Sequence, residues 1–176
     1  MNPTLEQQTD EGLMAKVAQG DLDVLQILFK RHHLHVFNFL YKMSGDKMLS
    51  EDLTQDVFYK VIKYRSSYKN GKFISWLFTI ARNSLKTHFT RNKDRHTDLE
   101  QVEHRIGEET KNEDYSQLQH ALNKLETSDR EVIVMNRFQE IRYTEIAEII
   151  GSTEGAVKTK VSRALKKLKT IYLESI

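Results

Sequence analysis

The sequence has a single proline, at position 3, and none between Thr4 and Ile176. Proline fixes φ and removes a backbone donor, so it is the residue that most reliably ends a helix. Helix formers such as Leu, Lys, Glu and Gln are plentiful, and only 7 glycines are present. Apolar residues recur at the spacing of one helix face along most of the chain. The sequence therefore predicts an all-α fold.

Several classes of function are excluded by what the sequence lacks. There is no cysteine, which rules out disulfides, thiolate zinc sites and thiol catalysis. The apolar runs are too short for a membrane span, and the N-terminal residues lack a signal-peptide pattern. No glycine loop suited to phosphate and no nucleophile with a partnered base is present. We expect a cytoplasmic protein that is not an enzyme, with no catalytic residue and no cofactor.

Seven histidines are present, and His32, His33 and His35 are close together in sequence. On one helix only some of these side chains could converge, and no cysteine assists them. We predict surface or packing roles for them and no metal site.

Charge is distributed in blocks along the chain. From Lys60 to Arg95 there are 10 basic residues and one acid, whereas from Thr97 to Ser116 there are 2 basic and 7 acidic residues. The acidic stretch also has few apolar anchors, which is typical of a linker. We predict two small helical domains, residues 1–95 and 116–176, joined by an acidic linker, residues 96–115. The two domains are expected to fold independently.

Apolar spacing and stop signals predict the helices of the first domain. The first helix ends near Gln19, the second near Met43, and the third opens at Ser50. A loop over 66–72 precedes a long helix from about Phe73 to Lys93. The polar face of the third helix is free to meet a partner, and its residues are Glu51, Asp52, Gln55 and Asp56.

The long helix combines cations with aromatic rings. Its inward stripe includes Trp76, which we interpret as a core residue. Its other side carries Arg82 and Lys86, with Phe78 and Phe89 between cations. Aromatic rings beside cations suit unstacked, single-stranded bases. This helix is therefore predicted to bind melted DNA.

The second domain contains the spacing of a helix-turn-helix. Ala147 is small where two helices cross, Gly151 suits a left-handed turn, and Val157 packs the second helix onto the first. Earlier in this domain, Ser128 and Glu131 have the spacing of a capping box. The second helix and its extension carry six basic residues and one acid, Glu154, and this excess of positive charge favours DNA binding over a structural hairpin. These cations are Lys158, Lys160, Arg163, Lys166, Lys167 and Lys169.

The same residues resemble a known family. Segments 143–151 (YTEIAEIIG) and 156–164 (AVKTKVSRA) are similar to region four of extracytoplasmic-function (ECF) sigma factors, of the sigma-70 family. Independently, segments 28–31 (LFKR), 50–58 (SEDLTQDVF) and 73–83 (FISWLFTIARN) resemble region two of that family, in the same order. One departure is Glu140, where the family usually has glycine.

The resemblance implies a sigma factor that binds core RNA polymerase, recognises promoter DNA and helps to open it. An anti-sigma factor is a further candidate partner. The polar face of the third helix would dock on the largest catalytic subunit of the polymerase. A base of the minus-ten element would flip into a pocket of the 66–72 loop, near Asn83. The residues expected at the minus-thirty-five element are Lys158, Thr159, Ser162, Arg163 and Lys166.

Two other functions are compatible with parts of the sequence. A stand-alone helix-turn-helix regulator would use residues 1–95 to sense a ligand or to dimerise, and it would bind DNA tightly without polymerase. An enzyme with a ligand cavity in its N-terminal half is the other, although no cluster of titratable residues favours it.

Overall fold

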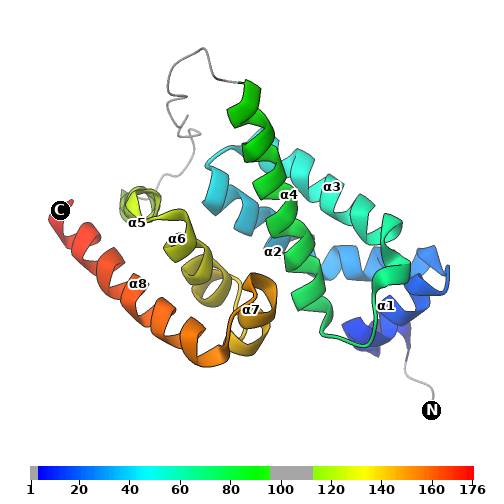
Figure 1. Ribbon diagram of the computed structural model, residues 1–176. Coiled ribbons are helices and arrows are strands. Elements are labelled where there is room, and N and C mark those ends of the chain that lie inside the picture. Colours follow the sequence, from blue (N-terminus) through cyan, green and yellow to red (C-terminus); the bar gives the residue numbers. More distant parts are fainter. Residues whose placement is uncertain (1–3, 96–112) are drawn as a thin grey trace.

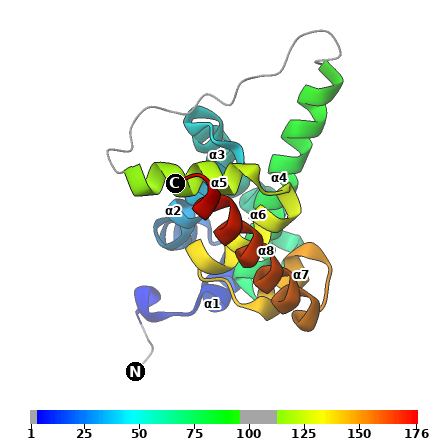
Figure 2. The ribbon, with the colours of Figure 1, turned by 90° about the vertical axis from the view of Figure 1, so that its left-hand side faces the viewer.

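The structure, a computed structural model, describes residues 4–95 and 113–176. Every regular element within these ranges is helical, which confirms the prediction of an all-α fold. Figures 1 and 2 show two groups of helices, one built by each part of the chain, lying against each other. None of the described helices combines the length and the apolar character that crossing a bilayer requires.

The first group is built around a long helix, α2, that packs on α3, which in turn packs on α4. Its core is apolar and includes Leu28, Phe39, Val57 and Leu77. The elements are η1 (Leu5–Gln7), α1 (Asp10–Ala18), η2 (Leu22–Val24), α2 (Leu25–Ser44), α3 (Lys47–Lys63), η3 (Arg65–Ser67) and α4 (Phe73–Arg95).

The start of α3 differs from the prediction. The helix begins at Lys47, because the side chain of Asp46 accepts a hydrogen bond from the Leu49 N–H at 3.0 Å and so caps it. Ser50, predicted to open the helix, lies fully buried within its first turn. Its hydroxyl donates to the Asp46 carbonyl at 2.6 Å instead.

Asp10 ties α1 to α2. It accepts a hydrogen bond from Arg31 at 2.9 Å, and its other oxygen lies 2.8 Å from His32 Nε2. Burial alone would raise the pKa of Asp10, but hydrogen bonds and charge from His32 and Arg31 outweigh it and lower this pKa. The carboxylate is thus held in its charged form.

The other two histidines of the cluster have separate partners. The ring of His33 stacks on Phe29 at 4.6 Å, and Nδ1 of His35 lies 3.0 Å from the side-chain oxygen of Gln139. Within the part of the chain that the structure describes, no three potential ligands come together for a metal ion.

The second group is organised by α8, which packs on α5, α6 and α7. Its first helix begins at Glu113, inside the stretch predicted as linker. The rest of that stretch, residues 96–112, lies outside the described residues. The elements are α5 (Glu113–Lys124), α6 (Thr127–Ile133), a π-helical turn η4 (Val134–Phe138), α7 (Tyr143–Ile150) and α8 (Glu154–Glu174).

The capping box predicted at Ser128 is wrong. The N-cap of α6 is Glu126, two residues before Ser128, and it makes no side-chain hydrogen bond to the helix. Glu131 is 6% exposed and forms an ion pair with Arg82 of the first group. Glu131 therefore pairs with the other helix group instead of capping its own helix.

The two groups share a continuous core. Buried residues of α6, η4 and α7, among them Val132, Met135 and Ile146, belong to the same cluster as those of the first group. α7 packs on α4, and α6 packs on α2. Independent folding of the two domains stays a prediction.

Replacing Glu140 with glycine should stabilise the protein. Glu140 has φ +56°, a left-handed conformation that costs a side-chain-bearing residue about 1–2 kcal/mol. Glycine avoids that cost, but it makes the unfolded chain more flexible, which lowers the free energy of unfolding by about 0.4–1 kcal/mol. We expect Glu140→Gly to raise the free energy of unfolding by about 0.5–1 kcal/mol in urea titrations. Glu148→Gly, an exposed position within α7, is the control and should lower it; a less stable Glu140→Gly protein would contradict the argument.

Candidate polymerase and nucleic-acid interfaces

The polar face of α3 lies at the surface, as its spacing predicted. Glu51, Asp52 and Gln55 are exposed, and Asp56 is half-buried. The Asp56 carboxylate forms an ion pair with Lys60, one turn along the helix, at 2.8 Å. Tyr59, 60% exposed, adds an apolar surface to this face. Such a mixture of polar groups and an exposed aromatic ring suits a reversible protein interface.

Only some of the α4 residues predicted to bind melted DNA are exposed to solvent. Asn83 and Lys86 are exposed, and Phe89 is 47% exposed. Phe78 is 1% exposed and packs edge-on against Phe39, with ring centroids 5.5 Å apart. The DNA contact predicted for Phe78 is therefore corrected to a core role.

Arg82 is also less accessible than its sequence position indicated. Its side chain is 19% exposed, and its Nε donates to a carboxylate oxygen of Glu131. Trp76 is half-buried and packs edge-on against Tyr68, with ring centroids 5.4 Å apart, which agrees with its interpretation as a core residue.

The loop before α4 borders a surface hollow of about 480 Å³. Glu11 on α1 accepts a hydrogen bond from the Phe73 N–H at 3.2 Å, which fixes the start of α4. Burial, followed by the charges of Glu11 and Asp10, raises the pKa of Tyr68 to about 12, so this phenol stays neutral. The hollow is lined by Glu11, Ala15, Ala18, Gln19, Ser66, Tyr68 and Asn70. Asn83 is not among them, so the structure does not unite it with the loop.

The helix-turn-helix geometry agrees with its sequence spacing. Gly151 follows α7 with φ +71°, and the Ser152 N–H donates to the Ala147 carbonyl at 2.8 Å. Thr153 then caps α8 by accepting a hydrogen bond from the Ala156 N–H at 3.2 Å. Val157 is fully buried against the preceding helix. The turn thus holds α8 at a fixed angle to α7.

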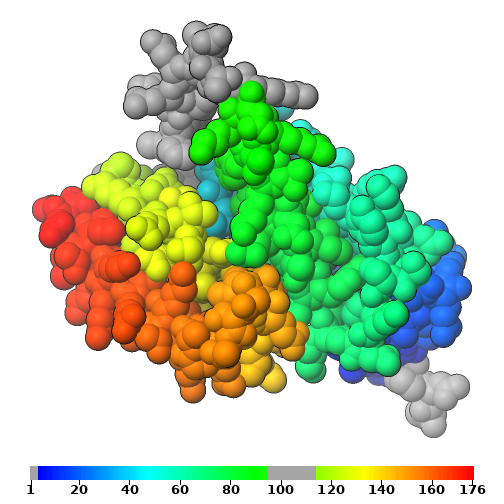
Figure 3. Space-filling model, viewed as in Figure 1, coloured from blue at the N-terminus to red at the C-terminus, as the bar shows by residue number. Residues whose placement is uncertain are grey.

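One side of α8 is open to solvent and carries every residue predicted at the minus-thirty-five element. These exposed residues are Lys158, Thr159, Ser162, Arg163 and Lys166. The opposite side packs through Val157, Val161, Ala164 and Leu168, and Leu165 is half-buried. α8 follows the edge of the molecule away from α4, and its surface is uncovered in Figure 3.

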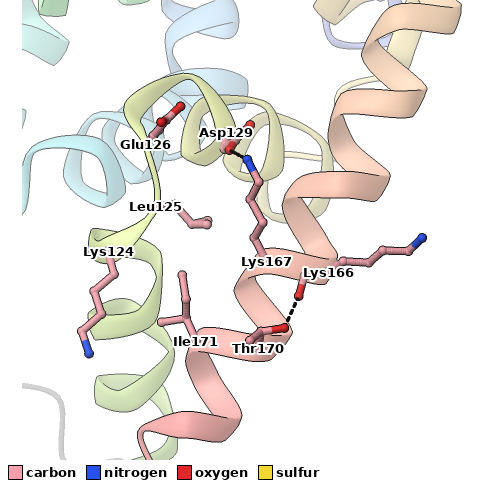
Figure 4. A pocket seen from close by; sticks show the side chains of 8 residues that line it. All are labelled: Lys124, Leu125, Glu126, Asp129, Lys166, Lys167, Thr170 and Ile171. Carbon is pink, nitrogen blue, oxygen red and sulfur yellow. Dashed lines mark hydrogen bonds and ion pairs between the residues drawn. The ribbon is translucent and has the colours of Figure 1, made fainter.

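The six cations of this helix do not all serve the same surface. Lys167 donates to the Asp129 carboxylate at 2.8 Å, and the hydrogen bond and charge of Asp129 raise the pKa of Lys167. The two residues border a surface pocket of about 470 Å³ between α5, α6 and α8, drawn in Figure 4. Lys166 extends away from Asp129 in that view. The structure therefore assigns Lys167 to internal pairing, which its sequence position could not reveal.

Comparisons with known families match both parts of the chain. The family model "Sigma-70 region 2" matches residues 28–95, and "Sigma-70, region 4" matches residues 115–168. RNA polymerase sigma factor CarQ of Myxococcus xanthus is 30% identical over 167 residues, covering 92% of this chain and 96% of CarQ. ECF RNA polymerase sigma factor SigM of Bacillus subtilis is 27% identical, covering 82% of this chain and 93% of SigM.

Solved structures share the fold. CnrH, solved with the cytosolic domain of CnrY, superposes with a TM-score of 0.75 at 23% identity, covering 94% of this chain and 97% of CnrH. RpoE of Bartonella quintana, solved with the anti-sigma factor NepR, gives 0.69 at 24% identity, covering 85% and 96%.

A stand-alone regulator would account for the helix-turn-helix but not for the match of residues 28–95 to sigma region 2. The matches to both regions, in order and over nearly the whole chain, identify one kind of protein. The chain belongs to the sigma-70 family of RNA polymerase sigma factors, in its extracytoplasmic-function group, and it recognises promoters and initiates transcription with RNA polymerase.

Proposed function

We propose that this sigma factor uses three surfaces: the polar face of α3 for core polymerase, the exposed residues of α4 for the melted minus-ten element, and the open side of α8 for the minus-thirty-five element. The observation that carries the proposal is the open side of α8. Five residues that carry hydrogen-bond donors or charge lie on this side, and the turn at Gly151 sets the orientation of the helix. A helix presented in this way fits the major groove.

The residues of the open side divide by chemistry into readers and anchors. Arg163 can donate two parallel hydrogen bonds to the edge of a guanine, which makes it the candidate for base recognition. Lys166 lies further along the helix and is a flexible point charge, which suits phosphate. Lys158 has its ammonium 6.0 Å from the centre of the Tyr143 ring, a contact that orients its charge near the start of the helix.

The exposed residues of α4 act on single-stranded DNA. Lys86 and Asn83 offer a charge and an amide to the backbone and bases, and Phe89 offers an accessible ring face for stacking. Arg82 joins them once its ion pair with Glu131 opens. The loop at 66–72 is the candidate pocket for a flipped base.

The remaining roles follow from the family. The chain acts as a regulatory subunit in the cytoplasm, with no catalytic residue of its own, and the polymerase supplies the chemistry. Because RpoE was solved with the anti-sigma factor NepR, we also propose that an anti-sigma factor controls this protein.

Transcription in vitro with purified core polymerase tests the proposal. The parent protein should direct initiation from its promoter, whereas Lys86→Ala should lower promoter opening on the order of tenfold, the value of one charged contact. Permanganate reactivity of unpaired thymines reports opening directly, and closed-complex formation should change less. Lys30→Ala, an exposed lysine on α2, is the control. Normal opening by Lys86→Ala would remove α4 from this role.

A further inference from the structure

The two helix groups are joined by a buried ion pair. The Arg82 guanidinium on α4 meets the Glu131 carboxylate on α6, and the two side chains are 19% and 8% exposed. Such a pair is stabilising only when each charge keeps its partner, because an unpaired buried charge is costly. The carboxylate of Glu131 thus depends on a cation from the other group.

Other polar contacts also join the two groups. The ammonium of Lys42 on α2 donates to the Tyr115 hydroxyl at 2.5 Å and lies 4.7 Å from the centre of the Phe138 ring. Arg130, next to Glu131, donates to the Met43 carbonyl at 3.1 Å. These contacts hold α5, α6 and η4 against the end of α2, so the ion pair is part of a closed arrangement.

Closure and DNA binding make competing demands on Arg82. The charge of a guanidinium that is paired with a buried carboxylate is already compensated, so it attracts a phosphate more weakly, and both anions present oxygen acceptors to the same group. Beyond Arg82, α4 presents Asn83, Lys86 and Phe89 to solvent. In the closed protein the exposed surface of α4 therefore lacks the free charge of Arg82.

We propose that Glu131 is an internal competitor for DNA: its carboxylate occupies the phosphate-binding group of Arg82, holds the free protein closed, and is displaced when α4 takes up single-stranded DNA. This inference rests on the proposed role of α4. By linkage, whatever favours the open arrangement strengthens DNA binding, and DNA in turn opens the protein.

The test uses the full chain and a fluorescein-labelled oligothymidylate of about 20 nucleotides, long enough to cover the exposed surface of α4. Fluorescence anisotropy at low salt gives the affinity. Glu131→Gln keeps the shape and removes the charge, and we expect it to bind at least about fivefold more tightly than the parent, the lower end of typical couplings between sites. In an Arg82→Ala background the same change should have no effect.

Asp129→Asn is the matched control. Asp129 also lies buried on α6, but its partner Lys167 belongs to the same helix group. Its affinity for the oligonucleotide should equal that of the parent. Equal affinities of Glu131→Gln and parent, or equal gains in both variants, would overturn the proposal. Lys86→Ala separates the two hypotheses: if it leaves binding unchanged, the role of α4 fails, whereas weaker binding without a gain in Glu131→Gln rejects the competitor alone.

A second readout follows closure itself. The chain has no cysteine, so Lys30→Cys on α2 and Lys169→Cys on α8 provide two thiols that can carry a donor and an acceptor dye without background labelling. Energy transfer between them should fall in Glu131→Gln and in the parent on saturation with the oligonucleotide. Unchanged transfer in the parent at saturation would refute displacement.

Discussion

Gln55→Arg and Asp56→Lys should each weaken the one-to-one complex with core RNA polymerase by about 30- to 150-fold, equivalent to about 2–3 kcal/mol. Both residues lie on the outward face of α3, beside Glu51 and Asp52, and none of the four belongs to the buried core. An acidic face favours a basic partner surface, so an added cation creates repulsion where attraction was needed. The fold should survive, because the changes are on the surface.

The measurement is a titration of labelled sigma factor with core polymerase, supported by thermal unfolding of each variant. Asp56→Lys also removes the pair with Lys60, but an exposed pair one helical turn apart contributes only about 0.3–0.5 kcal/mol. Asp23→Lys makes the same charge change at an exposed position in η2 and should leave the affinity unaltered. Binding as tight as that of the parent in both α3 variants would show that this face does not dock.

Local signals in the sequence were sufficient for much of the fold. Gly151 predicts the turn between α7 and α8 because a left-handed backbone favours glycine, and the structure gives it φ +71°. On α3 the helical period brings three apolar residues to one face, and all three are buried: Leu53, Val57 and Val61. These features depend on neighbours within one or two helical turns, which a single sequence contains.

Features set by packing between distant segments were not predictable. α4 contacts α3 and α2 as well as α7, so more than one of its faces is buried. Phe78, which was predicted to bind DNA, lies on one of these buried faces. Glu131 had the spacing of a capping residue, yet its partner is 49 positions away. The pairing of Lys167 with Asp129 likewise depends on how α6 crosses α8. Spacing identifies a helix face but not what covers it.

The same limit applies to the candidate sites. All five residues predicted for the minus-thirty-five element are exposed on α8, because that face packs against nothing within the described residues and the helical period alone decides it. On α4, by contrast, the residues predicted for DNA divide between exposed, paired and buried positions. The exposure of a site is therefore best predicted from sequence when its helix packs on one side only.

Arg163→Ala should relax base preference at one position of the minus-thirty-five element, whereas Lys166→Ala should weaken binding to all sequences alike. Both side chains are exposed on the open side of α8. Arg163 follows Thr159 by one helical turn, so the two share a line down the helix that can enter a groove. Two hydrogen bonds from Arg163 to guanine contribute about 1–3 kcal/mol of discrimination, or roughly 5- to 150-fold.

Selection from a promoter library randomised over the upstream element, with holoenzyme assembled from each variant, separates the two kinds of contact. For Arg163→Ala, one position should lose its preference while its neighbours keep theirs. For Lys166→Ala, every position should keep its preference, and the slope of log affinity against log salt should fall by about one, because one phosphate contact is lost. Lys167→Ala is the control, since the Lys167 ammonium is paired with Asp129, and its salt slope should match that of the parent. An Arg163→Ala protein that retains full preference at every upstream position would refute base recognition by this residue.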